Sequence, residues 1–383
     1  MRDVARNLPA SLIREVANQA MGQPGLTALW FGETDQPTDP IIRQAAIDSL
    51  AAGETFYSAN LGLPELRDAI AAYQDDRFGG ASSRDNVVVT VSGLNAILLA
   101  LSAIVDPGDE VVVITPTWPN LAAIPTLLGA SVRLAELTLT EAGYRLDADR
   151  LAQTLGPRTR AVIVNSPHNP SGWMISREEL KELVDLLDHR GIWLLMDEVY
   201  TRLVHSGSPV SVLPLRDDGR RIITVNSFSK TWAMTGWRLG WLTVPANAIG
   251  TFEKLMEFNT SCAPVFAQRA GIAAIEHGEA FVAAQQRRLM EARAAVIDVL
   301  GAHPRIQLPP LDATFYAFPR IDGLVDGKSF ALRAIAEEKI GLAPGEAFGE
   351  AGRGHVRLCY ARDPATVRGA CERMAALIDR LPD

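Results

Sequence analysis

The sequence predicts an α/β protein with a large domain, built on a mostly parallel sheet flanked by helices, and a smaller α+β domain formed by both chain ends. In the middle of the chain, short β-branched runs alternate with longer amphipathic segments. The runs are mainly apolar and do not alternate with polar residues, as in strands covered on both faces. A chain of 383 residues is also longer than a single hydrophobic core usually accommodates. We therefore expect a large domain over residues 45–279 and a small domain from residues 1–44 and 280–383.

The expected strands of the large domain follow one another along the chain. They are Val87–Val91, Glu110–Thr115, Arg160–Asn165, Ile192–Met196 and Ile222–Val225. Helical patterns lie between or after them, among them residues 178–189 and 268–276. Nearer the C-terminus the pattern becomes mixed, because short apolar runs at 311–321 and 355–360 flank a helix-like segment at 330–339. This mixture predicts the α+β unit.

Composition excludes several classes of protein. The net charge is −8 and no basic block is present, so we expect no nucleic-acid or membrane partner. Three cysteines without a C-x-x-C pair argue against a disulfide framework or a zinc site and favour a reducing compartment. The N-terminus lacks the apolar run of a signal peptide, and the longest apolar stretch, at 96–105, is too short to span a bilayer. We therefore expect a cytoplasmic protein without a metal.

Four groups of residues follow the strands at the edge where open parallel sheets bind ligands. Gly93 starts a helix and forms either an anion site or an ordinary turn. Asn169 lies between two prolines, in a loop that either presents it or is a plain turn. Asp197 is either a buried carboxylate that needs a cation or a helix cap. Lys230, among Ser, Phe and Trp, is either a nucleophile with a lowered pKa or a surface lysine.

Together these groups fit pyridoxal phosphate. That cofactor needs an amine that forms an imine, an anion site for its phosphate, and a carboxylate that keeps its ring nitrogen protonated. The sequence contains no H-E-x-x-H zinc motif, no G-x-S-x-G elbow and no phosphate-binding G-x-x-x-x-G-K-[ST] loop. We therefore expect pyridoxal 5'-phosphate as the cofactor.

The motifs around these residues resemble those of the fold-type I, class I/II aminotransferases of the aspartate aminotransferase superfamily. The resemblance is colinear from about Leu29 to Tyr360. The matching segments are YSANLGLPELR (Tyr57–Arg67), SPHNPSG (Ser166–Gly172), DEVY (Asp197–Tyr200), SFSKTWAMTGWRLGW (Ser227–Trp241), PGEAFG (Pro344–Gly349) and HVRL (His355–Leu358). Their shared order makes a chance match implausible.

The resemblance implies roles at the cofactor ring. Lys230 would form the imine with the cofactor and then move the substrate α-proton. Asp197 would pair with the ring nitrogen, while Tyr200 and Asn169 would hydrogen-bond the phenolic oxygen. Trp118, in the loop after the second strand, would stack on the ring.

The resemblance also implies a phosphate cradle. It would consist of the Arg238 and Ser227 side chains and the backbone of Gly93, Leu94 and Asn95, with Ser229 as a further candidate. Tyr57 resembles the tyrosine that reaches the phosphate of the neighbouring subunit, which implies a homodimer. Ser261 lies in a T-S-C-A-P segment similar to the family's T-S-N-P, with Cys262 in place of the usual Asn.

Substrate binding is implied for Gly32, Trp118, Asn169 and Arg357, of which Arg357 would clamp the α-carboxylate. Two further arginines, Arg14 and Arg269, could each meet a distal carboxylate or lie on the surface.

The chain departs from the family pattern where relatives line the side-chain pocket. Thr34 and Gln36 replace a proline and an aromatic residue, and Ala313–Tyr316 replaces the usual G-A-F-Y. These departures affect substrate choice, and the donor and acceptor stay open.

The predicted function is therefore amino transfer between an L-amino acid and a 2-keto acid. The same residues would also serve a lyase or cyclase that acts on an amino acid side chain. A non-catalytic protein that binds pyridoxal phosphate is a third, more remote alternative.

Overall fold

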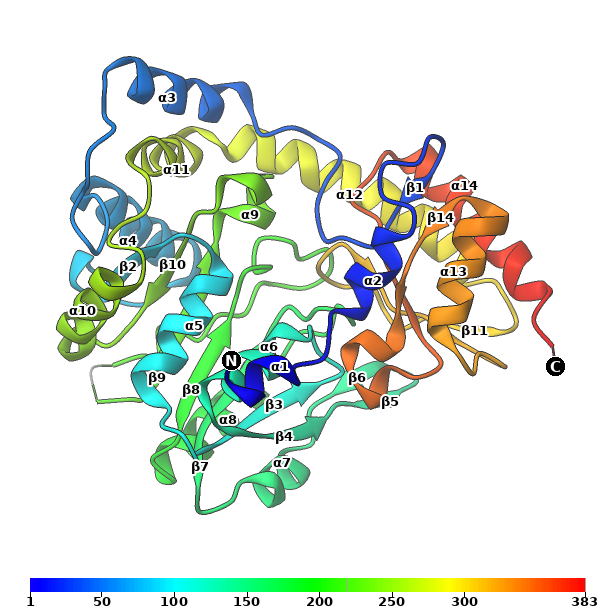
Figure 1. Ribbon diagram of the computed structural model, residues 1–383, viewed down its shortest axis with the longest axis horizontal. Helices are drawn as coiled ribbons and strands as arrows, with labels where there is room; N and C mark the ends of the chain where they lie inside the picture. The colour runs from blue at the N-terminus through cyan, green and yellow to red at the C-terminus, as the bar shows by residue number, and fades with distance from the viewer. Residues whose placement is uncertain (218, 383) are drawn as a thin grey trace.

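The computed structural model describes residues 1–217 and 219–382, and a seven-stranded sheet forms its centre (Figure 1). Six strands run parallel, and β10 runs antiparallel to both of its neighbours, β2 and β9. In spatial order the strands are β2 (Val87–Thr90), β10 (Gly240–Thr243), β9 (Ile222–Ser227), β8 (Trp193–Asp197), β7 (Thr159–Asn165), β3 (Glu110–Thr115) and β4 (Ser131–Glu136). The prediction of a mostly parallel sheet is confirmed.

All five expected strands are present, within one or two residues at each end. Two strands of the sheet, β4 and β10, were not expected. β10 has four residues and follows the glycine-containing segment at 236–240 directly, so it shows little periodicity of its own. Most of β4 is partly exposed, because it lies at the edge of the sheet, and its mixed sequence SVRLAE lacks the apolar run of a central strand.

Helices cover both faces of the sheet, and the side chains of β3 show how. Val111 and Val113 point into one apolar cluster, whereas Val112 and Ile114 point into the other. The first cluster is closed by α5 (Gly93–Ile104), α6 (Asn120–Leu128) and α10 (Ile249–Asn259). The second includes α8 (Arg177–His189), and α4 (Pro64–Phe78) and α11 (Val265–His277) pack at the β2 and β10 end.

Residues 12–28 and the C-terminal part of the chain come together beside this sheet, on the right in Figure 1. β1 (Thr27–Ala28) pairs in parallel with β14 (Ile340–Gly341), and α2 (Leu12–Asn18) packs against α13 (Gly327–Glu338). β16 (Val356–Cys359) lies between β12 (Tyr316–Ala317) and β15 (Ala343–Pro344). The remaining short elements are α1 (Asp3–Arg6), β5 (Thr138–Thr140), β6 (Gly143–Arg145), α7 (Ala148–Thr154), α9 (Phe228–Thr231), β11 (Ile306–Gln307) and β13 (Arg320–Ile321).

The helices α12 (Glu279–Leu300) and α3 (Pro40–Ala51) lie where the chain passes between the sheet region and the region formed by the chain ends. α12 begins beside α11 and packs along α14 (Pro364–Asp379). α3 packs against α11, so the expected boundary at residue 44 falls inside a helix that contacts the sheet region. The exact division into two domains stays a prediction. Among the described residues, no helix is both long and apolar enough to cross a membrane.

Candidate active site

A cavity of about 810 Å³ lies where the carboxyl ends of the parallel strands meet the region formed by the two chain ends. Most of the residues that the sequence singled out line it. They are Gly32, Gly93, Leu94, Trp118, Asn169, Asp197, Tyr200, Ser227, Ser229, Lys230, Arg238 and Arg357. Segments that are hundreds of residues apart in sequence therefore share one cavity.

Two of the expected residues do not line the cavity. The backbone N–H of Asn95 donates to Ser92 Oγ at 3.0 Å, and its side chain donates to Asn259 Oδ1 at 2.8 Å. Asn95 is thus occupied as part of the α5 helix cap and is not presented to the cavity. The Tyr57 side chain is 89% exposed and lies outside the cavity lining. Within this single chain, Tyr57 therefore has no part in the site.

Lys230 lies in the short helix α9, directly after β9, so the end of a buried strand fixes its position. Its Nζ donates to the Gly32 carbonyl oxygen at 2.7 Å and lies 6.0 Å from the centre of the Tyr200 ring. The pKa of Lys230 is lowered to about 8, mainly by burial and also by the nearby Arg357 and Arg238 charges, against a raising effect of Cys359 and Glu33. An appreciable fraction of this amine is therefore neutral near physiological pH.

Asp197 ends β8 and is buried in the cavity wall. Its Oδ1 accepts a hydrogen bond from the Val199 N–H at 3.3 Å, and no arginine or lysine among the described residues forms an ion pair with it. Burial raises the pKa of Asp197 to about 7, although the Val199 N–H and the Lys230 charge oppose the shift. A carboxyl group in such surroundings becomes a favourable anion only when a cation is brought to it.

The next residue, Glu198, turns away from the cavity. Its carboxylate accepts hydrogen bonds from Ser211 Oγ at 2.8 Å and from the Val212 N–H at 2.7 Å. Burial raises its pKa to about 7 as well. Of the two acids in the DEVY segment, Asp197 therefore faces the cavity and Glu198 anchors the following loop.

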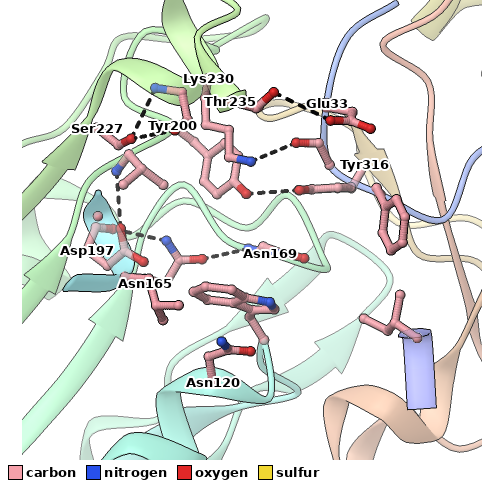
Figure 2. A pocket seen from close by; sticks show the side chains of 18 of the residues that line it. Glu33, Asn120, Asn165, Asn169, Asp197, Tyr200, Ser227, Lys230, Thr235 and Tyr316 are labelled. Carbon is pink, nitrogen blue, oxygen red and sulfur yellow. Dashed lines mark hydrogen bonds between the residues drawn. The ribbon is translucent and has the colours of Figure 1, made fainter. Parts of the chain in front are cut away.

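A row of amides connects Asp197 to the opposite wall (Figure 2). Asn165 Nδ2 donates to the Asp197 carbonyl at 3.0 Å, and Asn165 Oδ1 accepts from the Asn169 N–H at 2.8 Å. Asn169 Oδ1 in turn accepts from Arg357 Nη1 at 2.9 Å. This orientation leaves the Asn169 amide N–H groups available to donate to a ligand.

Arg357 lies in β16 and is almost completely buried. Besides its bond to Asn169, it donates through Nη2 to the Trp30 carbonyl, and its guanidinium lies over the rings of Tyr316 and Phe348. Its Nε is buried without a hydrogen-bond partner among the described residues, none of whose carboxylates pairs with it. A buried cation with an unused donor is a site for an anionic ligand.

The groups predicted to bind an anion lie at the end of β9 and the start of α5. Ser227 Oγ donates to Ser229 Oγ at 2.9 Å, and Arg238 Nη1 donates to the Thr235 carbonyl at 2.6 Å. Gly93 and Leu94 bring the first turn of the 12-residue helix α5 to the same place. Hydroxyl groups, an arginine and a helix N-terminus together suit a phosphate.

The segment Phe31–Gln36 contributes Phe31, Gly32 and Glu33 to the cavity lining and makes contacts with the regions on both sides. Toward the sheet region, Gly32 accepts from Lys230 and the Thr235 hydroxyl donates to Glu33 Oε2 at 3.4 Å (Figure 2). Toward the other region, Asp35 forms an ion pair with Arg288. Gly32 therefore lies against the predicted catalytic lysine, whereas Thr34 and Gln36, which depart from the family pattern, are not among the residues that line the cavity.

Several lining residues were not predicted, notably Asn165 and Tyr316. Asn165 could have been found, because it is the last residue of an expected strand. Tyr316 lies in the two-residue strand β12, which carries no periodicity that would point to it. The structure distinguishes the two arginines considered for a distal carboxylate. Arg14 lines the cavity and stacks on Phe31, whereas Arg269 lies elsewhere and pairs with Glu54 and Glu65.

Comparison with known proteins decides the family. Residues 27–374 match the family described as aminotransferase class I and II. The chain belongs to the class I and II aminotransferases. An aromatic-amino-acid aminotransferase of Thermococcus litoralis is 33% identical over 96% of this chain and 95% of its own length. An arginine–pyruvate transaminase of Pseudomonas aeruginosa is 34% identical over 94% of this chain and 92% of its own length.

Solved structures agree with this assignment. An aspartate aminotransferase from Thermus thermophilus, solved with maleate, superimposes on this aminotransferase with a TM-score of 0.92 at 30% identity, covering 98% of this chain and 99% of the other. The predicted α/β fold and the predicted aminotransferase activity are both confirmed. The relatives are named for aspartate, aromatic and arginine donors, so their names leave the donor of this enzyme open.

Proposed function

We propose that this aminotransferase uses pyridoxal 5'-phosphate to move an amino group between an L-amino acid and a 2-keto acid. The observation that carries the proposal is the pairing of two unsatisfied buried groups in one cavity. Arg357 is a cation without an anion, and Asp197 is a carboxyl without a cation. Lys230, with its lowered pKa, lies in the same cavity.

The cavity residues fit the cofactor group by group. Asp197 would pair with the protonated ring nitrogen, which would supply the cationic partner that this buried carboxyl group lacks. Ser227, Ser229 and Arg238, with the start of α5, would hold the phosphate. Tyr200 and the free amide N–H groups of Asn169 would donate to the phenolic oxygen.

When bound, pyridoxal phosphate supplies an aldehyde that condenses with amines and a ring that accepts electrons from the bond that breaks. The protein supplies the proton transfer. A neutral Lys230 Nζ can take a proton from the substrate α-carbon and later return it at a neighbouring position, since its pKa of about 8 is close to the working pH. The Gly32 carbonyl accepts a hydrogen bond from this amine and orients it.

Arg357 would bind the substrate α-carboxylate through its unused Nε–H and a remaining Nη N–H. Its two anchored N–H groups, on Asn169 and Trp30, fix the plane of the guanidinium before substrate arrives. A pre-oriented arginine loses little conformational freedom on binding. The α-carbon of the substrate would then lie between Arg357 and Lys230.

We also propose that the enzyme works as a homodimer, with Tyr57 of each subunit reaching the phosphate bound by the other. Large apolar side chains are exposed around this part of the chain, among them Phe56 at 83%, Tyr57 at 89% and Phe258 at 90%. Such exposure favours burial against a second chain. All three cysteines are free thiols, in keeping with the reducing cytoplasm that we propose as its location.

An absorption spectrum of the purified protein with pyridoxal phosphate tests this function. We expect a visible band that one amino acid bleaches while the corresponding keto acid is released. The amino acid that does so identifies the donor. No band after incubation with the cofactor would refute the proposal.

The same experiment separates amino transfer from the lyase or cyclase alternative. A β-substituted amino acid supplied without any keto-acid acceptor should give no continuing release of pyruvate. Sustained pyruvate release under these conditions would show that elimination is the main reaction.

A further inference from the structure

Tyr316 lies deep in the wall of the cavity, although nothing in the function proposed above uses it. It comes from β12, whose backbone pairs with β16 so that Tyr316 lies opposite Cys359, two residues from Arg357. The side chain is 1% exposed, yet it lines the cavity. A tyrosine hydroxyl buried this deeply needs a hydrogen-bond partner.

That partner is Tyr200. The two hydroxyl oxygens are 2.9 Å apart, and within the described residues each hydroxyl has only the other as a hydrogen-bond partner (Figure 2). Burial raises the pKa of Tyr316 to about 12 and also raises that of Tyr200, so both hydroxyls keep their protons at neutral pH. If Tyr200 donates its proton to a ligand, Tyr316 must be the donor between the two.

The ring of Tyr316 makes a second contact. The Arg357 guanidinium carbon lies 4.4 Å from the centre of the Tyr316 ring and 4.9 Å from that of Phe348. Aromatic faces attract a cation without using its N–H groups, which point outward in the guanidinium plane. The ring therefore supports Arg357 and leaves the Nε–H free.

The backbone at Gly32 makes the third contact. A Cβ atom at this glycine would lie only 1.7 Å from the Tyr316 hydroxyl oxygen, so the segment that accepts from Lys230 passes directly against that hydroxyl. Tyr316 thus contacts three residues with proposed roles, namely Tyr200, Arg357 and Gly32. None of these contacts depends on a bound group.

We propose that Tyr316 is a positioning residue for amino transfer, whose hydroxyl directs the Tyr200 proton into the cavity while its ring holds the Arg357 guanidinium in place. The inference rests on the function proposed above for Tyr200 and Arg357. A hydrogen bond donated to Tyr200 makes its own proton a better donor. Tyr200 would then better stabilise negative charge on the phenolic oxygen of the cofactor.

Two substitutions separate the two tasks. Tyr316→Phe keeps the ring and removes the hydroxyl, whereas Tyr316→Leu removes both. With weaker donation from Tyr200, the cofactor imine should hold its proton to higher pH, so the pKa of the visible band should rise by about 0.3 to 1 unit in Tyr316→Phe. The amino-acid KM should stay close to that of the unsubstituted enzyme in Tyr316→Phe and rise about 2- to 30-fold in Tyr316→Leu.

The measurement is a pH titration of the visible band of the loaded enzyme, together with KM and kcat for the amino acid that bleaches it. Tyr144→Phe is the matched control, because Tyr144 is also buried and its hydroxyl lies 3.3 Å from His355 Nε2, outside the cavity lining. The control should leave the pKa of the band unchanged. Circular dichroism establishes that each variant is folded.

An unchanged band pKa in Tyr316→Phe would overturn the role of the hydroxyl, and an unchanged KM in a folded Tyr316→Leu would overturn that of the ring. If Tyr316→Leu does not fold, a rise in the KM of Tyr316→Phe would count against separate tasks for the hydroxyl and the ring. A missing band in the unsubstituted enzyme would refute the cofactor proposal itself. The two failures are therefore distinguishable.

Discussion

Replacing Arg357 by alanine should weaken amino-acid binding far more than cofactor binding. The side chain is 3% exposed, its two Nη atoms are anchored on Asn169 and Trp30, and its Nε is unused. The substitution removes a buried charge and a two-pronged contact to the substrate carboxylate. We expect a loss of about 2–4 kcal/mol, which corresponds to a KM about 30- to 1000-fold higher.

The KM of Arg357→Lys should lie between those of the unsubstituted enzyme and Arg357→Ala. It keeps the positive charge but replaces a planar fork by a point charge, so one charge-assisted hydrogen bond is lost. The expected increase in KM is about 10- to 150-fold. The graded series distinguishes a carboxylate clamp from a residue that only fills space.

Single-turnover bleaching of the visible band, followed against amino-acid concentration, gives the binding constant for substrate. Quenching of protein fluorescence by pyridoxal phosphate gives that for the cofactor. Arg368→Ala serves as control, since Arg368 pairs with Asp298 on the surface and is half exposed. An unchanged KM, or an equal loss of cofactor affinity, would remove Arg357 from the substrate site.

Three further predictions concern other cavity residues. Lys230→Ala should abolish turnover in a protein that remains folded. In the unsubstituted protein, the rate at which Lys230 captures the cofactor should rise with pH and level off above about 8. Substantial residual turnover in the variant, or a capture rate that still rises at pH 10, would contradict the assignment. Asp197 has a raised pKa in the folded, cofactor-free protein, so its contribution to stability is present below pH 4 and is lost as pH rises to about 7. Asp197→Asn should therefore stabilise the cofactor-free protein at pH 8, relative to pH 5, by on the order of 2–4 kcal/mol in urea unfolding; equal changes at both pH values would refute this. Arg14→Gln should raise the KM for dicarboxylic donors more than for aromatic ones, and parallel changes in both values would exclude Arg14 from a distal carboxylate site.

Much of the sheet could be predicted because its strands are buried on both faces. The runs at 87–91, 110–115 and 222–225 are dominated by β-branched residues and do not alternate with charged ones, so their strand character is visible in the sequence. The edge strand β4 and the antiparallel β10 escaped this signal, β4 because most of it is exposed and β10 because its sequence GWLT contains no β-branched apolar run. Short strands are defined by their neighbours more than by their own sequence.

The site divides in the same way. Asp197 and Lys230 stand at the ends of apolar strands, where a charged residue is conspicuous in sequence. Tyr316 and Asn165 carry no such contrast, and their importance comes from contacts made across the fold. Asn95 shows the converse: its position at a helix start suggested a ligand contact, but the Ser92 cap already uses its N–H.

The cavity draws its two halves from different parts of the chain, and this has an evolutionary consequence. The groups proposed to hold the cofactor come from the sheet edge between Gly93 and Arg238, whereas those proposed to face the substrate include Arg14, Phe31–Glu33 and Arg357. Mutations in the second set leave the sheet edge untouched. A lineage can therefore exchange one amino donor for another without losing its chemistry on the way. Relatives named for aspartate, aromatic amino acids and arginine, all 30–34% identical to this chain, are the diversity that such an arrangement permits.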